Sequence, residues 1–428
     1  MTETTPTRGI DWASPETSSR LKARRRRQNR LKYAGMVSIG IAFLMLGILL
    51  VSIISSGYSA FVQTHVEIDV FFDPEAIDVD DLPRSNFNAV LAATMQAQFP
   101  EVEGTAELRR LTGILSDGAR WTIRDLIVEN PDLVGETVAV SVPVADTYDQ
   151  LYKGFIDRET PEQFRRLDDA QIAYFDRLVE EGRVEATFNW ALFFNADSRF
   201  PELAGLKGAI IGSFYALATC FVLSFPVGIG AAIYLEEFAP RNRFSDLIEV
   251  NINNLAAVPS VVFGLLALAV FLGWFGMPRS SPFVGGMTLA LMTLPTIIIA
   301  TRAALKAVPP SIREAALGVG ASRHQVVFQH VLPLAMPGIL TGTIIGLAQA
   351  LGETAPLLLI GMNAFITSAP ATPFDSSTAL PTQIFIWADS PERGFVSRTS
   401  AAIMVLLGFL VMMNAVAIYL RNRFQRTW

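Results

Sequence analysis

The stretch REAALGVGASRHQVVFQHVLPLAMPGIL, residues 313–340, separates two long apolar runs of the chain. Ser311 and Glu314 have the spacing of a capping box, in which a hydroxyl and a carboxylate satisfy free N–H groups of the first helical turn. Ser322 and Gln325 repeat this spacing further along the chain. The stretch therefore predicts two helices, each with a well-defined start.

A glycine turn is expected between these helices, because Gly318 or Gly320 can adopt the left-handed conformation that ends the first one. The second helix continues toward Pro333. The first is too short and too polar to cross a membrane, so we expect it to lie against the inner membrane surface with an apolar patch exposed. Such a patch suits insertion into a groove on a soluble partner. A capped surface helix without a partner is the alternative.

The composition places these helices in a membrane protein. Hydrophobic residues make up 51% of the 428 residues and charged residues only 17%, which is outside the usual range of soluble domains. An apolar run of about 20 residues crosses the hydrocarbon core as a helix. Six runs predict six transmembrane helices: Tyr33–Ile54, Gly208–Leu235, Val250–Pro278, Ser280–Thr301, Gln325–Gly352 and Thr399–Leu420.

Basic residues near the ends of the spans predict their orientation. Residues 1–32 contain nine lysines and arginines against three acids, so we expect the N-terminus in the cytoplasm. Six spans return the C-terminus to the same side. A basic segment before an apolar run is also typical of an export signal, but this run is too long and lacks a convincing cleavage site. We expect a retained anchor and a multi-pass protein of the bacterial inner membrane.

Residues 55–205 have a different composition from the rest of the chain. They hold 28 acidic residues against 12 basic ones, and a segment of this length can bury its own core. Apolar residues alternate at 66–72 and at 138–144, which predicts two strands. A helix is predicted at 160–182, with Thr160 and Gln163 as its capping box. We therefore expect an α+β domain on the periplasmic side.

The polar stretch at 313–340 resembles the EAA motif of bacterial ABC importer permeases. Glu314-Ala315-Ala316 is followed at the family's spacing by Gly320 and then by Leu332-Pro333. His330 departs from the pattern, because the family usually has an aliphatic residue there. In that family this loop is the coupling helix that docks on the ATP-hydrolysing subunit. The resemblance assigns coupling to Glu314, Ala315, Ala316, Gly320 and Pro333.

Two further segments resemble the PstA-type permeases of phosphate importers: ALGETAPLL at 350–358 and NLAAVPSVVFG at 254–264. The likeness covers residues 206–428 and is weaker over 55–205. It implies a type I importer fold and three partners: a second permease subunit (PstC-like), a dimer of ATPase subunits (PstB-like) and a periplasmic phosphate-binding protein (PstS-like). The chain has no P-loop motif, so we expect ATP on the partner ATPase and no cofactor here.

The predicted organisation is thus an α-helical membrane protein with six transmembrane helices and an inserted α+β periplasmic domain. Its parts are a basic cytoplasmic tail (1–32), the first transmembrane helix (33–54), the acidic domain (55–205) and a five-helix permease domain (206–428) with a cytoplasmic coupling loop (308–334).

Ionisable residues inside spans are costly and are therefore candidates for function. Glu353 lies roughly 24 Å into its span, counted from Pro337 at about 1.5 Å per residue. Its carboxylate repels an anion, so it either accepts a hydrogen bond from a protonated phosphate oxygen or forms an ion pair, with a neighbouring subunit or within the bundle. Arg302 ends its span and can snorkel. The other candidates for a translocation pathway can equally bond neighbouring helices: Asn253, Asn254, Ser260, Thr293 and Thr296.

These observations predict a non-catalytic permease subunit of an ATP-driven inorganic phosphate importer. A permease for another oxyanion or for a phosphonate is the close alternative. A signal-transmitting or exporter-type membrane protein with a periplasmic sensor domain is the alternative of another class. An enzyme is disfavoured, because no Ser-His-Asp, metal-ligand or cofactor pattern stands out in the sequence.

Overall fold

The computed structural model describes residues 15–77, 81 and 85–424. The chain forms two compact units that divide after Ser55. The first contains most of helix α1 (Pro15–Gly57), which includes the expected first span and carries exposed basic residues on its early turns. Residues 1–14 of the predicted tail lie outside the described part.

A three-stranded antiparallel sheet with the order β2-β1-β3 lies at the centre of the α+β domain. Its strands are β1 (Val62–Phe71), β2 (Thr137–Pro143) and β3 (Val184–Phe188). The fully buried Val66 of β1 pairs with Val142 on one side and with Val184 on the other. The two strands predicted from alternation are confirmed. Sequence reasoning missed β3, whose five residues are too few to give a clear period.

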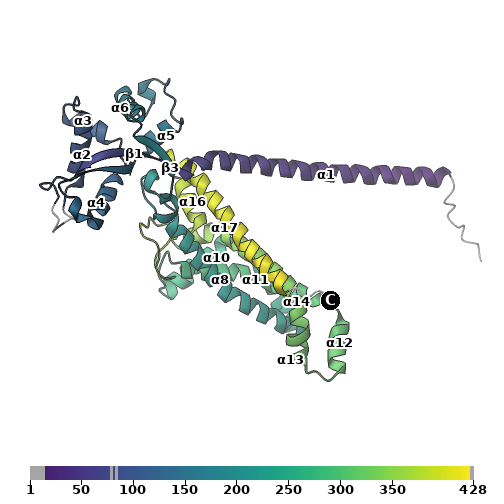
Figure 1. Cartoon of the computed structure of the whole chain (residues 1–428). Coiled ribbons are helices and arrows are strands. Elements are labelled where there is room, and N and C mark those ends of the chain that lie inside the picture. The colour runs from purple at the N-terminus through teal and green to yellow at the C-terminus, as the bar shows by residue number, and fades with distance from the viewer. Residues whose placement is uncertain (1–14, 78–80, 82–84, 425–428) are drawn as a thin grey trace, which may run out of the picture. The chain divides into compact units, whose positions relative to one another are not determined.

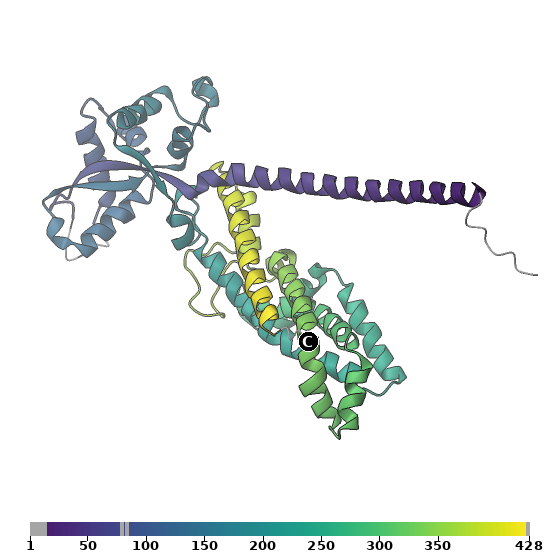
Figure 2. The same ribbon diagram turned by 45° about the vertical axis from the view of Figure 1, so that its right-hand side comes forward.

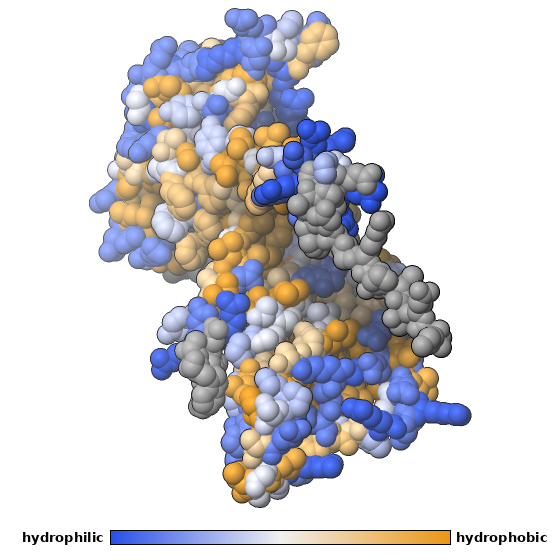
Figure 3. Space-filling model, turned by 90° about the vertical axis from the view of Figure 1, so that its right-hand side faces the viewer, coloured by the Kyte–Doolittle hydropathy of each residue, from blue (hydrophilic) through white to orange (hydrophobic). Residues whose placement is uncertain are grey.

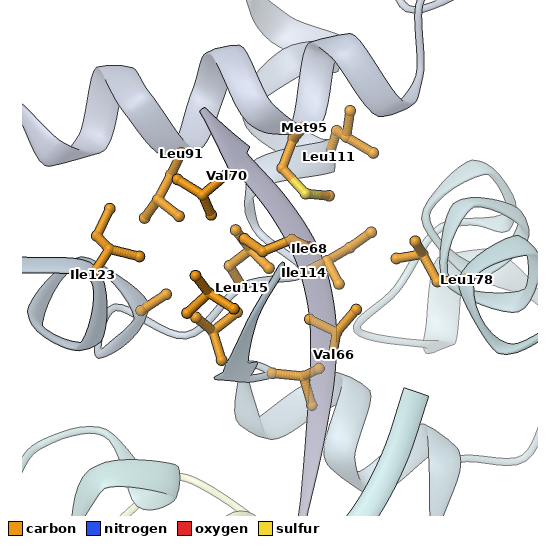
Figure 4. Packing of buried hydrophobic residues seen from close by; sticks show 14 of the residues in the cluster. Val66, Ile68, Val70, Leu91, Met95, Leu111, Ile114, Leu115, Ile123 and Leu178 are labelled. Atoms are coloured by element: carbon orange, nitrogen blue, oxygen red, sulfur yellow. The ribbon is translucent and has the colours of Figure 1, made fainter. Parts of the chain in front are cut away.

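Helices complete the core of this domain. Ile68 and Val70 of β1 are fully buried and belong to one apolar cluster with Met95 and Leu178, which come from two different helices (Figure 4). Burying one such side chain contributes roughly 1.5–3 kcal/mol, so this cluster holds the sheet and the helices together. The helices are α2 (Phe87–Gln98), α3 (Thr105–Thr112), α4 (Ala119–Glu129), α5 (Asp146–Tyr152), α6 (Asp169–Glu180) and α7 (Ala191–Phe194).

Helix α6 begins later than predicted. Asp168 and Gln171 form the capping box that starts it. The box predicted at Thr160 and Gln163 is wrong, because that stretch contains a 3-10 turn outside the helix. Gly182 has a φ of +72° and provides the expected left-handed stop.

Five helices in the described part of the chain are long and apolar enough to cross a membrane, and there are six if one bent pair counts as a span. Besides α1 they are α8 (Lys207–Ile233) with its π-helical end η6 (Tyr234–Phe238), α11 (Pro282–Lys306), α13 (Arg323–Gln325) with the π-helical η8 (Val326–Val331) and α14 (Leu332–Gly352), and α17 (Gly394–Phe424). Shorter helices are α12 (Pro310–Gly318), α15 (Ala355–Leu359) and α16 (Leu380–Ala388).

The predicted third span is not one straight helix. It consists of α9 (Arg243–Ala256) and α10 (Ser260–Ala267), which continues as the π-helical η7 (Leu268–Trp274), and the chain bends by 99° between them. Pro259 explains the break, because proline has no N–H to donate and disfavours a helical conformation at the preceding Val258. Hydropathy alone predicted the apolar run but not its bend.

Small residues allow close contacts at the centre of the bundle, where α8, α11 and α14 lie side by side (Figures 1 and 2). A Cβ atom on Gly286 of α11 would lie 2.5 Å from the carbonyl oxygen of Ala216 in α8. One on Gly338 of α14 would lie 2.8 Å from the Cβ of Ala304 in α11. Such small residues let membrane helices approach each other closely.

A buried arginine connects the α+β domain to the last span. Arg398 of α17 is 6% exposed, and its guanidinium donates a 2.6 Å hydrogen bond to the carbonyl oxygen of Ala204. Three acidic residues of the α+β domain, Asp146, Asp149 and Glu202, interact electrostatically with this guanidinium. Because a buried charge is stable only when compensated, this polar cluster is a strong link between the domain and the spans.

The buried carboxyl group of Asp146 makes the stability of this link depend on pH. Burial raises its pKa to about 6, and the charges of Glu202 and Asp149 add to this effect. An unfolded aspartate titrates near pH 3.9, so between about pH 4 and 6 the folded state holds a proton that the unfolded state releases. Stability is therefore lost as the pH rises through this window, and the loss is complete above about pH 6.

The variant Asp146→Asn is expected to remove this penalty. At pH 8 it should be more stable than the wild-type chain by about 3 kcal/mol, and below about pH 4 the two should be equal. Melting temperatures of the full-length chain, measured by intrinsic fluorescence across this pH range, test the expectation. The exposed Asp132→Asn serves as the matched control. A difference that does not vary with pH would contradict the assignment.

Candidate functional site

The polar segment forms a helix, a glycine turn and a second helix, as predicted. Helix α12 ends at Gly318, and the chain turns at Gly320, whose φ of +89° favours glycine. Helix α13 starts at the predicted capping box of Ser322 and Gln325. The segment continues through η8 into α14, so the second helix of the loop is the beginning of a span.

The start of α12 differs from the prediction. Pro309 is its N-cap residue and Pro310 its first helical residue. Proline fits there because the first N–H groups of a helix have no partner within the helix. Ser311 therefore lies inside the first turn, and the capping box predicted for Ser311 and Glu314 is wrong.

Arg313 fixes α12 to two spans. Its guanidinium donates hydrogen bonds to the carbonyl oxygens of Leu305 in the last turn of α11, at 2.9 Å, and of Val308 in the connection that follows, at 2.8 Å. It also forms an ion pair with the carboxylate of Glu237 in η6, at 2.7 Å. The last carbonyls of a helix have no partner within it, so Arg313 satisfies two acceptors while its charge is neutralised. Helix α12 cannot move relative to α8 and α11 without breaking these bonds.

The inner face of α12 is apolar. Ala316 is 7% exposed and belongs to a buried cluster with Val326 and Val327 of η8. Of the residues that the family resemblance assigned to coupling, Ala316 thus packs inside the loop. Pro333 is half-buried near the start of α14.

The outer face of α12 and the following turn are exposed. Glu314 and Ala315 lie on this face, and the exposed fractions of Leu317 and Val319 are 49% and 86%. We call these four residues the coupling surface. Exposed apolar side chains gathered on a rigid element, rimmed by polar groups, are typical of a surface that binds a protein.

A second network of ion pairs lies at the same ends of the spans. Arg302 of α11 contacts the carboxylates of Glu236 in η6, at 3.3 Å, and Glu249 in α9, at 2.9 Å. Lys306 lies 3.6 Å from the same Glu236 carboxylate. The charge of Arg302 is therefore compensated within the chain. Its role in the translocation pathway stays a prediction.

Two helices break where part of the predicted pathway lies. Helix α10 begins at Ser260 after the 99° bend, and α14 ends at Gly352 before α15 begins at Ala355. The two new helices pack together, since a Cβ on Gly264 would lie 2.7 Å from the Cα of Pro356. Broken helices in spans leave backbone groups free to line a site, an arrangement found at the substrate sites of transporters.

Glu353 occupies the second of these breaks. It follows the last residue of α14 with extended backbone angles, φ −76° and ψ 122°, and it is half-buried. Among the described residues, none forms an ion pair or a hydrogen bond with its carboxylate. The alternative that Glu353 forms an ion pair within its own bundle is therefore not supported by the described residues.

The remaining predicted pathway residues do not gather at one point. Asn253 and Asn254 are exposed on α9. Thr293 is buried on α11, where its hydroxyl lies 3.4 Å from the Sγ of Cys220 in α8. Thr296 is half-buried almost one turn further along. Thr293 thus bonds a neighbouring helix, one of the two roles considered for it.

Residues 224–426, which include the coupling surface and both helix breaks, match the family described as "Binding-protein-dependent transport system inner membrane component". The phosphate transport system permease protein PstA of Haemophilus influenzae is 31% identical over 52% of this chain and 78% of that protein. The chain belongs to the binding-protein-dependent permease family. The permease is accordingly a multi-pass membrane subunit of an ABC importer.

Other relatives agree with this family. The phosphate transport system permease protein PstA 1 of Mycobacterium tuberculosis H37Rv is 30% identical over 51% of the permease and 70% of that protein. The probable ABC transporter permease protein YqgI of Bacillus subtilis is 28% identical over 55% and 84%. Residues 18–162 match a separate family described as "Domain of unknown function (DUF3333)". A structure of the MetNI methionine ABC transporter covers 50% of the permease and 95% of that chain, with 16% identity and a TM-score of 0.40.

Sequence reasoning missed the roles of Arg313, Glu237 and Val319. The pair of Arg313 and Glu237 joins positions 76 residues apart, and no local pattern shows such a contact. The sequence signal for this ion pair was Glu237 itself, one of two adjacent acids at the end of an apolar run. For Val319 the signal was an apolar residue beside a glycine turn, where polar residues are usual.

Proposed function

We propose that this permease is the membrane subunit of an ATP-driven phosphate importer and forms part of the translocation pathway. The support for phosphate is that relatives described as phosphate transport permeases match the part of the chain that holds the coupling surface and the helix breaks. The proposed partners are a second permease subunit (PstC-like), an ATPase dimer (PstB-like) and a periplasmic phosphate-binding protein (PstS-like). ATP is bound by the ATPase, and the permease itself needs no cofactor.

The observation that carries this proposal is the rigid attachment of an exposed surface. Val319 and Leu317 are exposed beside the turn, whereas Arg313 ties the same helix to α8 and α11. A partner that binds the coupling surface therefore moves the spans when it moves. This arrangement suits a separate motor protein, which an ABC importer has in its ATPase.

The orientation follows from the same proposal. The coupling surface faces the cytoplasm, where ATP is available, and basic residues such as Arg241 and Arg243 near this end agree with the positive-inside rule. Helix α8 has 27 residues and is about 40 Å long. This length is enough to cross the bilayer, which supports a periplasmic position for Lys207 and the α+β domain. The proposal includes both chain termini in the cytoplasm of a bacterium and the spans in its inner membrane.

Uptake into vesicles tests the substrate. The complete importer, reconstituted with its partners, should take up radiolabelled phosphate only when ATP reaches the ATPase side. Excess unlabelled phosphate should compete, and excess sulfate or methylphosphonate should not. Uptake that prefers one of these competitors would identify a permease for another oxyanion or a phosphonate. Failure of any ATPase to co-purify with the permease would contradict the importer itself.

Glu353→Gln is expected to lower phosphate uptake by about tenfold or more. The carboxylate, unpartnered within the described chain, then no longer accepts a charge-assisted hydrogen bond from protonated phosphate or from a cation of the second permease subunit. Such a bond contributes roughly 1.5–3 kcal/mol, and 1.4 kcal/mol corresponds to about tenfold. Initial uptake rates measure the effect, with Glu353→Asp as the control that keeps the charge. Wild-type uptake by Glu353→Gln would exclude Glu353 from the pathway.

A further inference from the structure

Aromatic side chains gather on the α+β domain where β3 leads into α7. Phe188 and Trp190 have ring centroids 4.8 Å apart, and Trp190 and Phe194 have centroids 5.9 Å apart. Their exposed fractions are 46%, 63% and 62%. We call these three residues the aromatic foot. Three adjacent and exposed rings are unusual on a domain that faces only water.

Backbone hydrogen bonds hold the aromatic foot beside the first residue of a span. The N–H of Leu206 donates to the carbonyl oxygen of Leu192 in α7 at 2.7 Å, and the N–H of Lys207 donates to that of Asn195 at 3.1 Å. Lys207 is the first residue of α8. Helix α7 is a single turn that follows Trp190 and ends with Phe194, so the foot and the start of α8 form one rigid structure.

This attachment fixes the depth of the aromatic foot relative to the membrane. The apolar part of α8 begins directly after Lys207, and α8 is about 40 Å long, so Lys207 lies at the edge of the hydrocarbon core or up to about 10 Å beyond it. The hydrocarbon core is about 30 Å thick and the whole bilayer about 40–45 Å, which leaves roughly 5–8 Å for the headgroup layer on each side. Asn195, which is hydrogen-bonded to Lys207, and the adjacent Phe194 therefore lie at the level of this layer.

The chemistry of the foot suits phospholipid. Tryptophan and other aromatic side chains are enriched at the membrane interface, where the ring is buried and the indole N–H stays near water. Charge does not provide an attachment, because residues 55–205 carry 28 acids against 12 bases and anionic lipids repel them. On the face shown in Figure 3, hydrophilic residues dominate the upper rim, and hydrophobic residues reach the surface below it.

We propose that the aromatic foot of Phe188, Trp190 and Phe194 inserts into the headgroup layer of the membrane that the permease spans. Apolar contact between the foot and phospholipid holds the α+β domain in a fixed orientation on the bilayer surface. The contact is independent of the transported substrate and of the ATPase.

Spin labels can measure this insertion in the full-length chain. The chain has one cysteine, Cys220, which is buried, so introduced cysteines can be labelled selectively. Labels at Trp190→Cys and Phe194→Cys are compared with a label at Phe71→Cys, which replaces an aromatic residue that is 50% exposed. Phe71 ends β1, nine residues after Val62, and thus lies about 30 Å further along the strand. The chains are placed in nanodiscs of phosphatidylcholine and phosphatidylglycerol.

The readout is the collision rate of each label with oxygen, which concentrates in lipid, and with a nickel chelate, which stays in water. The expected result is a several-fold higher oxygen-to-nickel ratio at positions 190 and 194 than at 71. Equal ratios at all three positions would overturn the proposal. Low collision rates with both reagents at 190 and 194 would show that protein covers the foot, which would also overturn it.

A second measurement avoids labels. Brominated phospholipids quench the fluorescence of tryptophans in contact with lipid, so Trp190→Phe should reduce the quenched fraction of the fluorescence. Trp121→Phe, which removes an exposed tryptophan that stacks on Arg124, should not reduce it. An unchanged quenched fraction in Trp190→Phe would contradict insertion even if the cysteine variants failed to fold.

Discussion

Arg313→Ala is expected to lower ATP-driven uptake by about 100-fold while the chain still inserts into the membrane. The substitution removes the hydrogen bonds to the carbonyl oxygens of Leu305 and Val308 and leaves Glu237, whose side chain is 11% exposed, without its cation. Losing a hydrogen bond to a charged group costs roughly 1.5–3 kcal/mol, and 1.4 kcal/mol corresponds to tenfold in an equilibrium. The coupling surface then no longer moves rigidly with α8 and α11. Phosphate uptake per ATP hydrolysed measures the loss.

A matched control lies in the same loop. Arg323 is exposed, and none of the described residues forms an ion pair with it, so Arg323→Ala should leave the coupling ratio nearly unchanged. The charge exchange Arg313→Glu with Glu237→Arg should restore part of the activity. A coupling ratio in Arg313→Ala equal to that of the wild type would show that α12 is held by its apolar contacts alone.

Arg398→Met is expected to destabilise the permease by about 1–3 kcal/mol, the cost of leaving a buried acceptor unsatisfied. Methionine preserves much of the apolar volume, but the carbonyl oxygen of Ala204 loses its donor and the buried acids around it lose their cation. The expected result is a lower melting temperature of the full-length chain. Arg393→Met, five residues earlier and exposed, is the control that should change little.

The pH dependence of this defect provides a further check. Burial raises the pKa of Asp146 to about 6 and also raises the pKa of Glu202. Protonation of these acids at low pH removes the negative charge that Arg398 compensates. The gap in stability between Arg398→Met and the wild type should therefore narrow as the pH falls below about 6. A gap that stays constant from pH 8 to pH 4 would mean that the acids are not what Arg398 stabilises.

A capping pattern predicted the start of a helix correctly where no preceding residue could start the helix earlier. The box of Ser322 and Gln325 forms as predicted, because nothing before Ser322 can start the helix earlier. The same spacing at Ser311 failed, since Pro310 already occupies the first helical position. Capping spacing is therefore informative only together with the residues before it.

The predicted helix at 160–182 shows the influence of the core. Phe164 lies within the predicted range but outside α6, and it is 76% exposed. Ile172, Phe175 and Leu178 instead belong to the buried cluster that includes Val66, Ile68 and Val70 of the sheet, and α6 starts at the point that places the three helix residues on one face. Packing decided which part of the periodic stretch became helical, and packing partners cannot be read from a local pattern.

The candidate site was predictable in its location but not in its contacts. The coupling loop was found from its motif, and Glu353 from being a charge within an apolar run. Arg398 directly precedes the last predicted span, whereas its environment comes from Asp146 and Glu202, which lie far away in the sequence. Interactions between charges on distant segments depend on the fold. The sequence therefore shows which residues are charged but not which residues they interact with.

The connection between α11 and α12 consists of only three residues. Val308 is buried, and Pro309 has a ring-fixed φ of −55°. So short a connection, with one torsion fixed by a proline ring, limits how far α12 can swing away from the end of α11. The few bonds of Arg313 are therefore enough to turn the loop into a lever whose displacement reaches the membrane interior.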